Sequence, residues 1–280
     1  MRYSLLILLL FFKPSDPDNP MLNFIEKESP LWISSESAIN TNQVDSTLTV
    51  VSFNIEFALR LDEAIRELSS YPYKNADIIL LQEMDERGTL YISEELEYNY
   101  LYFPMSRHPK HRKNFGNAIL SKWPIMHPEK IILPHAQPLN RLKRGATSGI
   151  IKYGTIDIKV YSLHLETPVL SRKKRLQQLQ RTIDTMNASD HTDLIIFGGD
   201  FNSLFPQDVV EMVNLCQRNE LEWNTRQIGH TLRKYNVIRP TLDHIFSKGF
   251  DLLAAGKTKK SLASDHFPIW AKLKINNSQG

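Results

Sequence analysis

The sequence predicts an α/β sandwich in which neighbouring strands include antiparallel pairs. Strand-like runs of apolar and β-branched residues alternate with a few segments of helical spacing. A tight turn at 152–155 joins the strand-like runs 147–152 and 156–165, whereas a purely parallel sheet needs a long crossover at every step. With 280 residues, of which 41% are hydrophobic, we expect one large domain rather than two small ones.

The net charge and the cysteine content exclude only a few kinds of site. The formal net charge of +3 is only mildly basic, so composition alone does not indicate nucleic-acid binding. Each basic cluster taken singly is typical of a solvated loop or helix face; the clusters are 107–113, 141–144, 172–175 and 257–260. The single cysteine, Cys216, excludes an internal disulfide and a cysteine-based zinc site.

The N-terminal residues 1–20 have the outline of a signal peptide or hydrophobic leader. Arg2 precedes an apolar run, 5–12, that is too short to span a bilayer, which needs about 20 residues. We therefore expect an exported or membrane-associated protein, although translation from Met21 would give a cytoplasmic one. Residues 21–46 are rich in Pro, Asp, Asn and Ser, which predicts a linker or loosely packed arm.

The predicted domain runs from 47 to 276, followed by a short tail, 277–280. Helical spacing predicts helices over 61–70, 172–186 and near 208–216. Apolar, β-branched or alternating runs predict strands over 48–57, 76–82, 98–103, 117–120, 131–133, 147–152, 156–165, 194–199, 242–246 and 267–275. No internal repeat of fixed period is present.

The most informative stretch is 194–203, an apolar strand that runs into Gly198 and Gly199 and then into Asp200 and Asn202. Glycines let the backbone turn sharply or approach a ligand closely. In extended backbone, residues two apart point the same way, so a carboxylate and an amide converge at the end of this strand. Taken alone, the segment could equally be a strand followed by an Asx-type turn.

Oxygen-bearing side chains also fall at or near the ends of other predicted strands; they are Asn54, Glu83, Asp243 and Asp265. Carboxylate and amide oxygens suit hard divalent cations, Mg²⁺ above all. Glu83 directly follows a buried apolar run, where a lone acid is costly unless a cation receives it. Glu83 is therefore the first choice for a metal ligand, and the alternative is a glutamate at a solvated strand end.

Two histidines occupy comparable positions. His266 follows Asp265 just before the last predicted strand, and His164 lies near the end of the strand 156–165. Histidine titrates near neutral pH, so it can donate a proton to a phosphoryl oxygen or a leaving group. Asp243 is the candidate carboxylate to fix the His266 tautomer, as in hydrolase triads. A single strand histidine is more often a packed or surface residue.

Taken together, these motifs resemble those of the endonuclease/exonuclease/phosphatase superfamily, the DNase I-like group. The motifs that carry the resemblance follow one another in the family's order; they are 52–54, 81–83, 116–121, 162–165, 199–202, 242–243 and 264–266. The resemblance implies a four-layer α-β-β-α sandwich of two mixed, largely antiparallel sheets. It also implies hydrolysis of a phosphoester that depends on Mg²⁺, for which Mn²⁺ may substitute.

The resemblance also implies roles for individual residues. Glu83 would be the principal metal ligand, with Asn54 and Asp265 close by. An additional family acid would lie in a helix after the Glu83 strand, where Asp85, Glu86, Glu94 and Glu95 compete.

The remaining roles concern the phosphate and the attacking water. Asp200 would orient or deprotonate the water, and Asn202 would hold the phosphoryl oxygens. His266, braced by Asp243, would stabilise the transition state. His164 would contact the phosphate or serve the leaving group, and we expect Arg144 to contact the phosphate.

The expected substrate is a phosphoester, with nucleic acid preferred, contacted by the basic runs 107–113, 141–144 and 172–175. A phospholipid or sphingomyelin phosphodiesterase is an alternative, and it needs an exposed aromatic hairpin, for which 98–103 is the only candidate. The third hypothesis is a binding module without catalytic activity. We predict a monomer without a protein partner.

Overall fold

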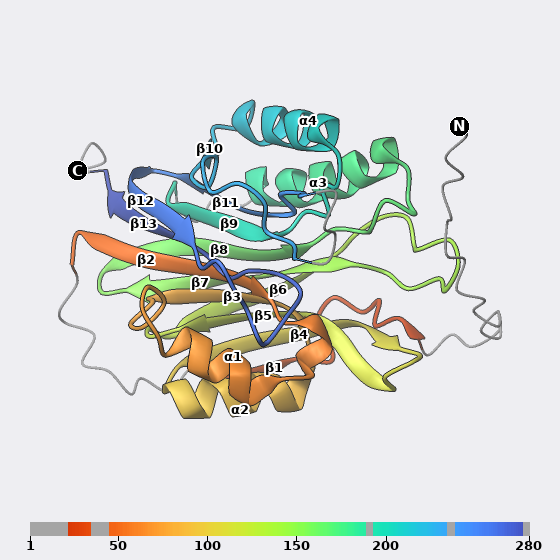
Figure 1. Ribbon diagram of the computed structural model, residues 1–280, viewed down its shortest axis with the longest axis horizontal. Helices are drawn as coiled ribbons and strands as arrows, with labels where there is room; N and C mark the ends of the chain where they lie inside the picture. The colour runs from red at the N-terminus through yellow and green to blue at the C-terminus, as the bar shows by residue number, and fades with distance from the viewer. Residues whose placement is uncertain (1–21, 35–44, 189–192, 234–238, 277–280) are drawn as a thin grey trace, which may run out of the picture.

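Two β-sheets lie face to face, and helices cover the outer face of each (Figure 1). The computed structural model describes residues 22–34, 45–188, 193–233 and 239–276. Sheet A has seven strands in the order β1-β4-β5-β3-β2-β13-β12, and sheet B has six in the order β10-β11-β9-β8-β7-β6. Helices α1 and α2 cover sheet A, and α3 and α4 cover sheet B. The predicted four-layer α-β-β-α sandwich is confirmed.

Each sheet is mixed, with a single parallel pair among the strands that the structure describes. Sheet A pairs β2 and β3 in parallel; its strands are β1 (Trp32–Ser34), β2 (Thr47–Asn54), β3 (Ile78–Met84), β4 (Asn99–His108), β5 (Lys113–Ser121), β12 (Phe250–Lys257) and β13 (Ile269–Ile275). Sheet B pairs β8 and β9 in parallel; its strands are β6 (Ile125–Ile132), β7 (Gly145–Tyr153), β8 (Ile156–His164), β9 (Ile195–Asp200), β10 (Glu222–Trp223) and β11 (Asp243–Lys248).

The helices account for the remaining regular structure of the described residues. They are a short 3₁₀ turn (Glu56–Ala58), α1 (Leu61–Leu68), α2 (Glu86–Leu96), α3 (Arg172–Asn187) and α4 (Pro206–Gln217). The hairpin predicted around the turn at 152–155 is present as β7 and β8. The elements that were not predicted are β1, β10, β12, α2 and the 3₁₀ turn. Helix α2 carries few apolar residues, and the edge strand β12 exposes four consecutive side chains instead of alternating.

The apolar runs of β3 and β9 are continuous because each sheet is covered on both faces. In β3, Ile78 and Leu80 point into the core between the sheets, whereas Ile79 and Leu81 pack beneath α1 and α2. In β9, Ile196 likewise faces the other sheet. Successive strand residues point to opposite faces, so a strand between two apolar layers needs apolar residues at every position.

The arm predicted over 21–46 is packed more closely than expected where the structure describes it. Strand β1 pairs with β4 and extends sheet A. Asn23 donates to the carbonyl oxygen of Arg141 at 3.0 Å, and Lys130 donates to the carbonyl oxygens of Phe24 and Ser29. The folded domain therefore includes 22–34 in addition to the predicted 47–276. The predicted leader, 1–20, and tail, 277–280, lie outside the described residues.

The described helices include none that is both long and apolar enough to cross a membrane. The aromatic stretch 98–103 is not an exposed hairpin either. It begins β4, where Leu101, Tyr102 and Phe103 are buried, and the Tyr98 hydroxyl donates to the carbonyl oxygen of Ala76. The prediction of an ordinary strand over 98–103 is therefore confirmed, and the lipid alternative lacks the exposed hairpin that it needs at this stretch.

The basic run 172–175 is solvated only in part, since Lys173 and Lys174 are exposed and Arg175 is buried, and its contact with phosphate stays a prediction. The Arg175 side chain is only 3% exposed, and its guanidinium donates to Asp208 Oδ1 at 2.9 Å and to the carbonyl oxygen of Asn202 at 2.7 Å. Arg172 reaches the same Asp208 oxygen at 2.8 Å from a more exposed position. These arginines join α3 to α4 and to the loop after β9.

Replacing Arg175 with methionine should lower the free energy of unfolding by about 3 kcal/mol, because it removes the more buried of the two arginines that pair with the buried Asp208 carboxylate. Arg172→Met is the matched control, since its ion pair with the same carboxylate is more exposed and its loss should lower the free energy of unfolding much less. Urea denaturation measures both. Equal, small losses would mean that Arg172 alone satisfies Asp208.

Candidate active site

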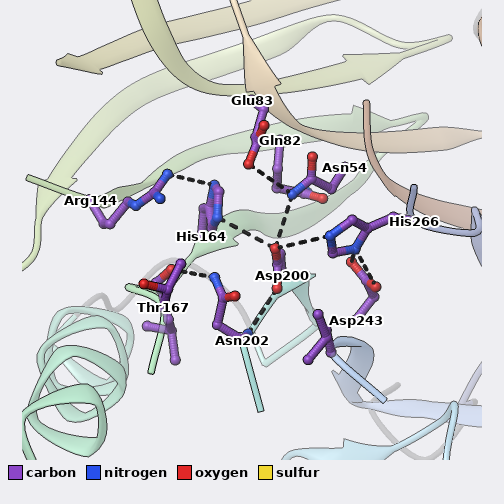
Figure 2. Close-up of polar contacts among 12 residues, drawn as sticks. Asn54, Gln82, Glu83, Arg144, His164, Thr167, Asp200, Asn202, Asp243 and His266 are labelled. Carbon is purple, nitrogen blue, oxygen red and sulfur yellow. Dashed lines mark hydrogen bonds and ion pairs between the residues drawn. The ribbon is translucent and has the colours of Figure 1, made fainter. Parts of the chain in front are cut away.

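The predicted site residues come together where the sheets meet at one end of the sandwich (Figure 2). The parallel pairs β2–β3 and β8–β9 bring Asn54, Glu83, His164 and Asp200 to that end. Strand β11 begins opposite the end of β9, and β13 begins beside the end of β2. The residues line or adjoin a pocket of about 290 Å³, whose lining is Glu56, Phe57, Glu83, Arg144, His164, Thr167, Pro168, Asp200, Asn202, Leu204, Leu232, Leu242, Asp265 and His266.

Glu83 enters the pocket from a β-bulge. The register of β3 against β5 shifts between Gln82 and Met84, so Glu83 is the extra residue, and its φ of +61° lies in the left-handed region. Its Oε1 accepts from Asn54 Nδ2 at 3.3 Å and its Oε2 from the Phe57 backbone N–H at 3.1 Å. Burial raises the pKa of the Glu83 carboxyl, an effect that Arg144 and His266 oppose.

The Asp200 carboxylate contacts residues from both sides of the site. Gly199 precedes it with φ of +146°, and a Cβ there would lie 1.9 Å from the carbonyl oxygen of Leu163, so only glycine fits. The Asp200 carboxylate accepts from Asn54 Nδ2 at 2.9 Å and from the Asn202 backbone N–H at 2.8 Å. Burial raises the pKa of the Asp200 carboxyl. A base with a raised pKa is suited to accept a proton near neutral pH.

Asp243 and His266 form the predicted carboxylate–imidazole pair. His266 Nδ1 lies 2.9 and 3.1 Å from the two Asp243 oxygens, and its Nε2 lies 3.8 Å from Asp200 Oδ2. Burial lowers the pKa of His266, but Asp243 and Asp200 outweigh burial and hold it well above the usual value. The Ser264 hydroxyl accepts from the His266 backbone N–H and donates to the Asn54 carbonyl oxygen, which fixes this loop to the end of β2. The ring is therefore a positioned imidazolium.

Arg144 and His164 form the opposite side. His164 Nε2 lies 3.4 Å from Asp200 Oδ2, and its Nδ1 lies 3.4 Å from an Arg144 nitrogen. Burial, Arg144 and His266 lower the pKa of His164, so this ring is neutral. Arg144 Nε donates to the buried Glu166 carboxylate at 3.3 Å, and its guanidinium lies 4.7 Å from the centre of the Phe115 ring.

The role of Glu166 as the holder of Arg144 was not predicted. The signal was present, because His164 and Glu166 are two residues apart and such residues share a side in extended backbone. The expected place of Asn54 beside the metal stays a prediction. Its Nδ2 joins two carboxylates, and its Oδ1, the atom that could bind a metal, accepts from the Glu56 backbone N–H at 3.1 Å. In this arrangement Asn54 positions Glu83 and Asp200.

Asn202 also reaches the pocket, but its amide Nδ2 donates to the Leu165 carbonyl oxygen at 2.9 Å. The role of this side chain in holding phosphoryl oxygens stays a prediction. The four acids that competed for the additional position do not line the pocket. Asp85 instead accepts from the Gly88 backbone N–H at 2.6 Å and pairs with Lys113, so it caps α2. Glu94 lines a different pocket.

One rim of the pocket is aromatic, which the sequence did not indicate. Phe57 has φ of +60°, and its ring stacks on His111 with centroids 4.5 Å apart and lies 4.7 Å from His108. Both histidines belong to the run 107–113, which forms the hairpin between β4 and β5. Part of this basic run is therefore packed against the site and is not a plain solvated loop.

The donor set fits a hard divalent cation. Glu83 and Asp265 both line the pocket, and no described cationic side chain lies within ion-pair distance of Glu83. Asp200, Asp243 and His266 also offer ligand atoms within 4.8 Å of one another. However, His266 Nδ1 already faces Asp243, which leaves only Nε2 of this ring for a metal. Glu83 is thus the better centre for a metal site.

Both the sequence and the fold of this chain are similar to those of known proteins. The model of the endonuclease/exonuclease/phosphatase family matches residues 51–266. A Beutenbergia cavernae endonuclease/exonuclease/phosphatase structure is 20% identical, with a TM-score of 0.65 over 82% of this chain and 72% of that one. D. rerio TDP2 complexed with single strand DNA product is 17% identical, with a TM-score of 0.66 over 82% and 100%.

A third structure, the mannosyl-6-phosphatase of Bacteroides thetaiotaomicron VPI-5482, is 18% identical, with a TM-score of 0.62 over 81% of this chain and 100% of that one. No curated protein matches the sequence. The structural likenesses, all under 25% identity, concern the fold, and the family match adds the shared chemistry.

Proposed function

Because the chain belongs to the endonuclease/exonuclease/phosphatase family of phosphoester hydrolases, we propose that it is a Mg²⁺-dependent phosphodiesterase that cleaves nucleic acid by in-line attack of water. The observation that carries the proposal is the cluster around Asp200, where a buried base, a positioned imidazolium and a neutral imidazole surround one pocket. Each chemically necessary position is filled, which argues against a silent binding module.

In the proposed reaction, Asp200 accepts a proton from the attacking water. Asn54 and the Asn202 backbone N–H hold its carboxylate in place at 2.9 and 2.8 Å. His266 donates from Nε2 to a phosphoryl oxygen, because Asp243 occupies its Nδ1 and favours the charged ring. Hydrogen-bond donors aimed at charge that develops in the transition state lower the barrier by several kcal/mol in total, at about 2.7–4 kcal/mol for each donor.

Arg144 supplies a second charged donor for the phosphate. Glu166 holds its Nε and one terminal nitrogen faces His164 Nδ1, which leaves the other terminal nitrogen to reach the phosphate in the pocket. His164, which is neutral, lies between Arg144 and Asp200 and contacts the phosphate or the leaving group. Glu83 and Asp265 would hold the metal, which would act as a Lewis acid on the phosphoryl oxygens.

Nucleic acid is preferred over a phospholipid as substrate. The stretch 98–103 that a lipid enzyme would need at its surface is part of a buried strand. The rim formed by Phe57, His108 and His111 offers aromatic faces on which a base can stack. The D. rerio TDP2 structure, with single strand DNA product, is a precedent on the same fold. We expect a monomer that is exported or membrane-associated.

Removing divalent metal should abolish hydrolysis. We expect the full-length protein to cleave single-stranded DNA or 5′-tyrosyl DNA in Mg²⁺ and to lose at least about a thousandfold in rate in EDTA, since a bound metal contributes several kcal/mol to transition-state stabilisation. Plasmid DNA, sphingomyelin, mannose 6-phosphate and bis-p-nitrophenyl phosphate complete the panel. Preferred turnover of sphingomyelin or of the monoester would overturn the assignment to nucleic acid, and undiminished rates in EDTA would overturn the metal dependence.

A further inference from the structure

A second pocket adjoins the catalytic pocket. It has a volume of about 490 Å³, and its lining residues are His230, Leu232, Arg233, Arg239, Lys257, Lys259 and Phe267. Leu232 lines both pockets, and its backbone forms a bridge with His266. The Arg233 backbone N–H also donates to the Asp265 carbonyl oxygen at 2.8 Å. The two pockets therefore share a wall that contains catalytic and metal-site backbone.

The charges of this second pocket are all of one sign. Arg233, Arg239, Lys257 and Lys259 line it, and the described part of its lining includes no carboxylate. Within the described residues, none of these four side chains has a carboxylate within ion-pair distance. Four cations gathered without counter-charges repel one another, and such an arrangement favours a bound anion. Burial lowers the pKa of Lys257, which agrees with a cation held away from water.

The wall of the second pocket is partly apolar and partly fixed. Lys257 Nζ lies 4.9 Å from the centre of the buried Phe267 ring, and an Arg233 nitrogen donates to the Ser261 carbonyl oxygen at 2.7 Å. Phe267 directly follows His266 in the chain. The pocket can thus take an anionic group that is attached to an organic body, with the anion on the cations and the body along Leu232 and Phe267.

We propose that this pocket binds a second phosphate of the same substrate molecule whose scissile phosphoester occupies the catalytic pocket. The inference rests on the proposed function, since it takes the catalytic pocket to bind a phosphoester. The second phosphate could be the next one along a nucleic-acid chain or the other phosphate of a small bisphosphate. In either case the shared wall at Leu232 separates the two phosphates.

The test compares substrates that differ by one phosphate. Thymidine dinucleotide, TpT, has one phosphodiester, and pTpT adds a 5′-phosphate. The variant is Arg239→Ala/Lys259→Ala, because Arg233 is bonded to the Asp265 backbone and is best left intact. The ratio of kcat/KM for pTpT to that for TpT should fall at least about tenfold in this variant. Lys272→Ala/Lys274→Ala is the matched control, since it removes the same charge from exposed positions of β13 outside the pocket, and it should leave the ratio unchanged.

Binding separates failure of this inference from failure of the proposed function. Calorimetry in EDTA with pTpT and TpT, and with fructose 1,6-bisphosphate and fructose 6-phosphate, measures the same ratios without turnover. If the wild type hydrolyses neither the dinucleotides nor single-stranded DNA nor 5′-tyrosyl DNA, the proposed function fails, and the binding ratios alone decide on the pocket. A tenfold fall confined to the pTpT pair identifies a nucleic-acid phosphate, and one confined to the hexose pair identifies a small bisphosphate. Unchanged ratios in both pairs, or an equal fall in the control, would overturn the inference.

Discussion

Replacing Glu83 with glutamine is expected to reduce kcat/KM by about a thousandfold or more without unfolding the protein. The substitution removes the carboxylate that we place at the centre of the metal site, and several kcal/mol of transition-state stabilisation correspond to about three factors of ten in rate. The side chain keeps its size. The amide NH₂ of the glutamine must, however, face either Asn54 Nδ2 or the Phe57 backbone N–H, and both of these groups donate to the Glu83 carboxylate of the wild type.

The stability of this variant should change by about 1 kcal/mol or less. Losing one hydrogen bond destabilises the fold by about that amount. The opposing effect comes from burial, which raises the pKa of the Glu83 carboxyl, so the ionised form is disfavoured in the folded state and a neutral side chain relieves that cost. Kinetics in Mg²⁺ and urea denaturation in EDTA measure the two effects.

Glu94→Gln is the matched control for the same change, since Glu94 is exposed and lies outside the catalytic pocket. It should keep wild-type activity. Retention of activity within tenfold in Glu83→Gln would contradict the placement of the metal and would move attention to the group formed by Asp200, Asp243 and His266.

Replacing Asp243 with asparagine should lower kcat by about two to three factors of ten, comparable to the loss of one donor from a preorganised site. Asparagine can still accept from His266 Nδ1, now 2.9 Å from a carboxylate oxygen. It supplies no charge, however, and the burial that lowers the pKa of His266 would then act with less opposition. Less of the ring would be the imidazolium that donates to the phosphate.

A readout specific to His266 distinguishes this positioning role from general damage. Titration of the His266 ring by NMR in EDTA should show a lower pKa in Asp243→Asn than in the wild type. Asp157→Asn serves as the control, because Asp157 is a partly exposed acid that pairs with Lys152 and lies at the start of β8, at the opposite end of the strand from His164. An unchanged His266 pKa together with unchanged kcat would exclude the proposed part of Asp243.

Much of the site could be predicted because of where polar residues interrupt apolar runs. Glu83 and Asp200 lie near the ends of strands that begin with consecutive apolar residues, 78–81 in β3 and 195–197 in β9, and such runs require both faces of a sheet to be covered. The parallel pairs of the two sheets then bring these strand ends to one place. For these residues, the sequence pattern and the strand pairing lead to the same site.

Other features depend on partners that are distant in sequence. Arg175 belongs to a basic run of solvated appearance, and its burial follows from Asp208, 33 residues later. The side-chain orientation of Asn54 depends on two carboxylates from different sheets. The stacking of Phe57 on His111 joins a turn after β2 to the hairpin between β4 and β5. Spacing along the chain does not encode such contacts.

The order of the strands in sheet A has a consequence for synthesis on the ribosome. Strand β13, from the end of the chain, lies between β2 and β12 and pairs with β2 along most of its length. A nascent chain made only as far as β11 carries Glu83, Asp200 and Asp243 but lacks His266, and the edge of β2 is still unpaired. Unpaired edges of apolar strands promote association between chains. A product of premature termination before β13 is therefore expected to be both inactive and prone to aggregate.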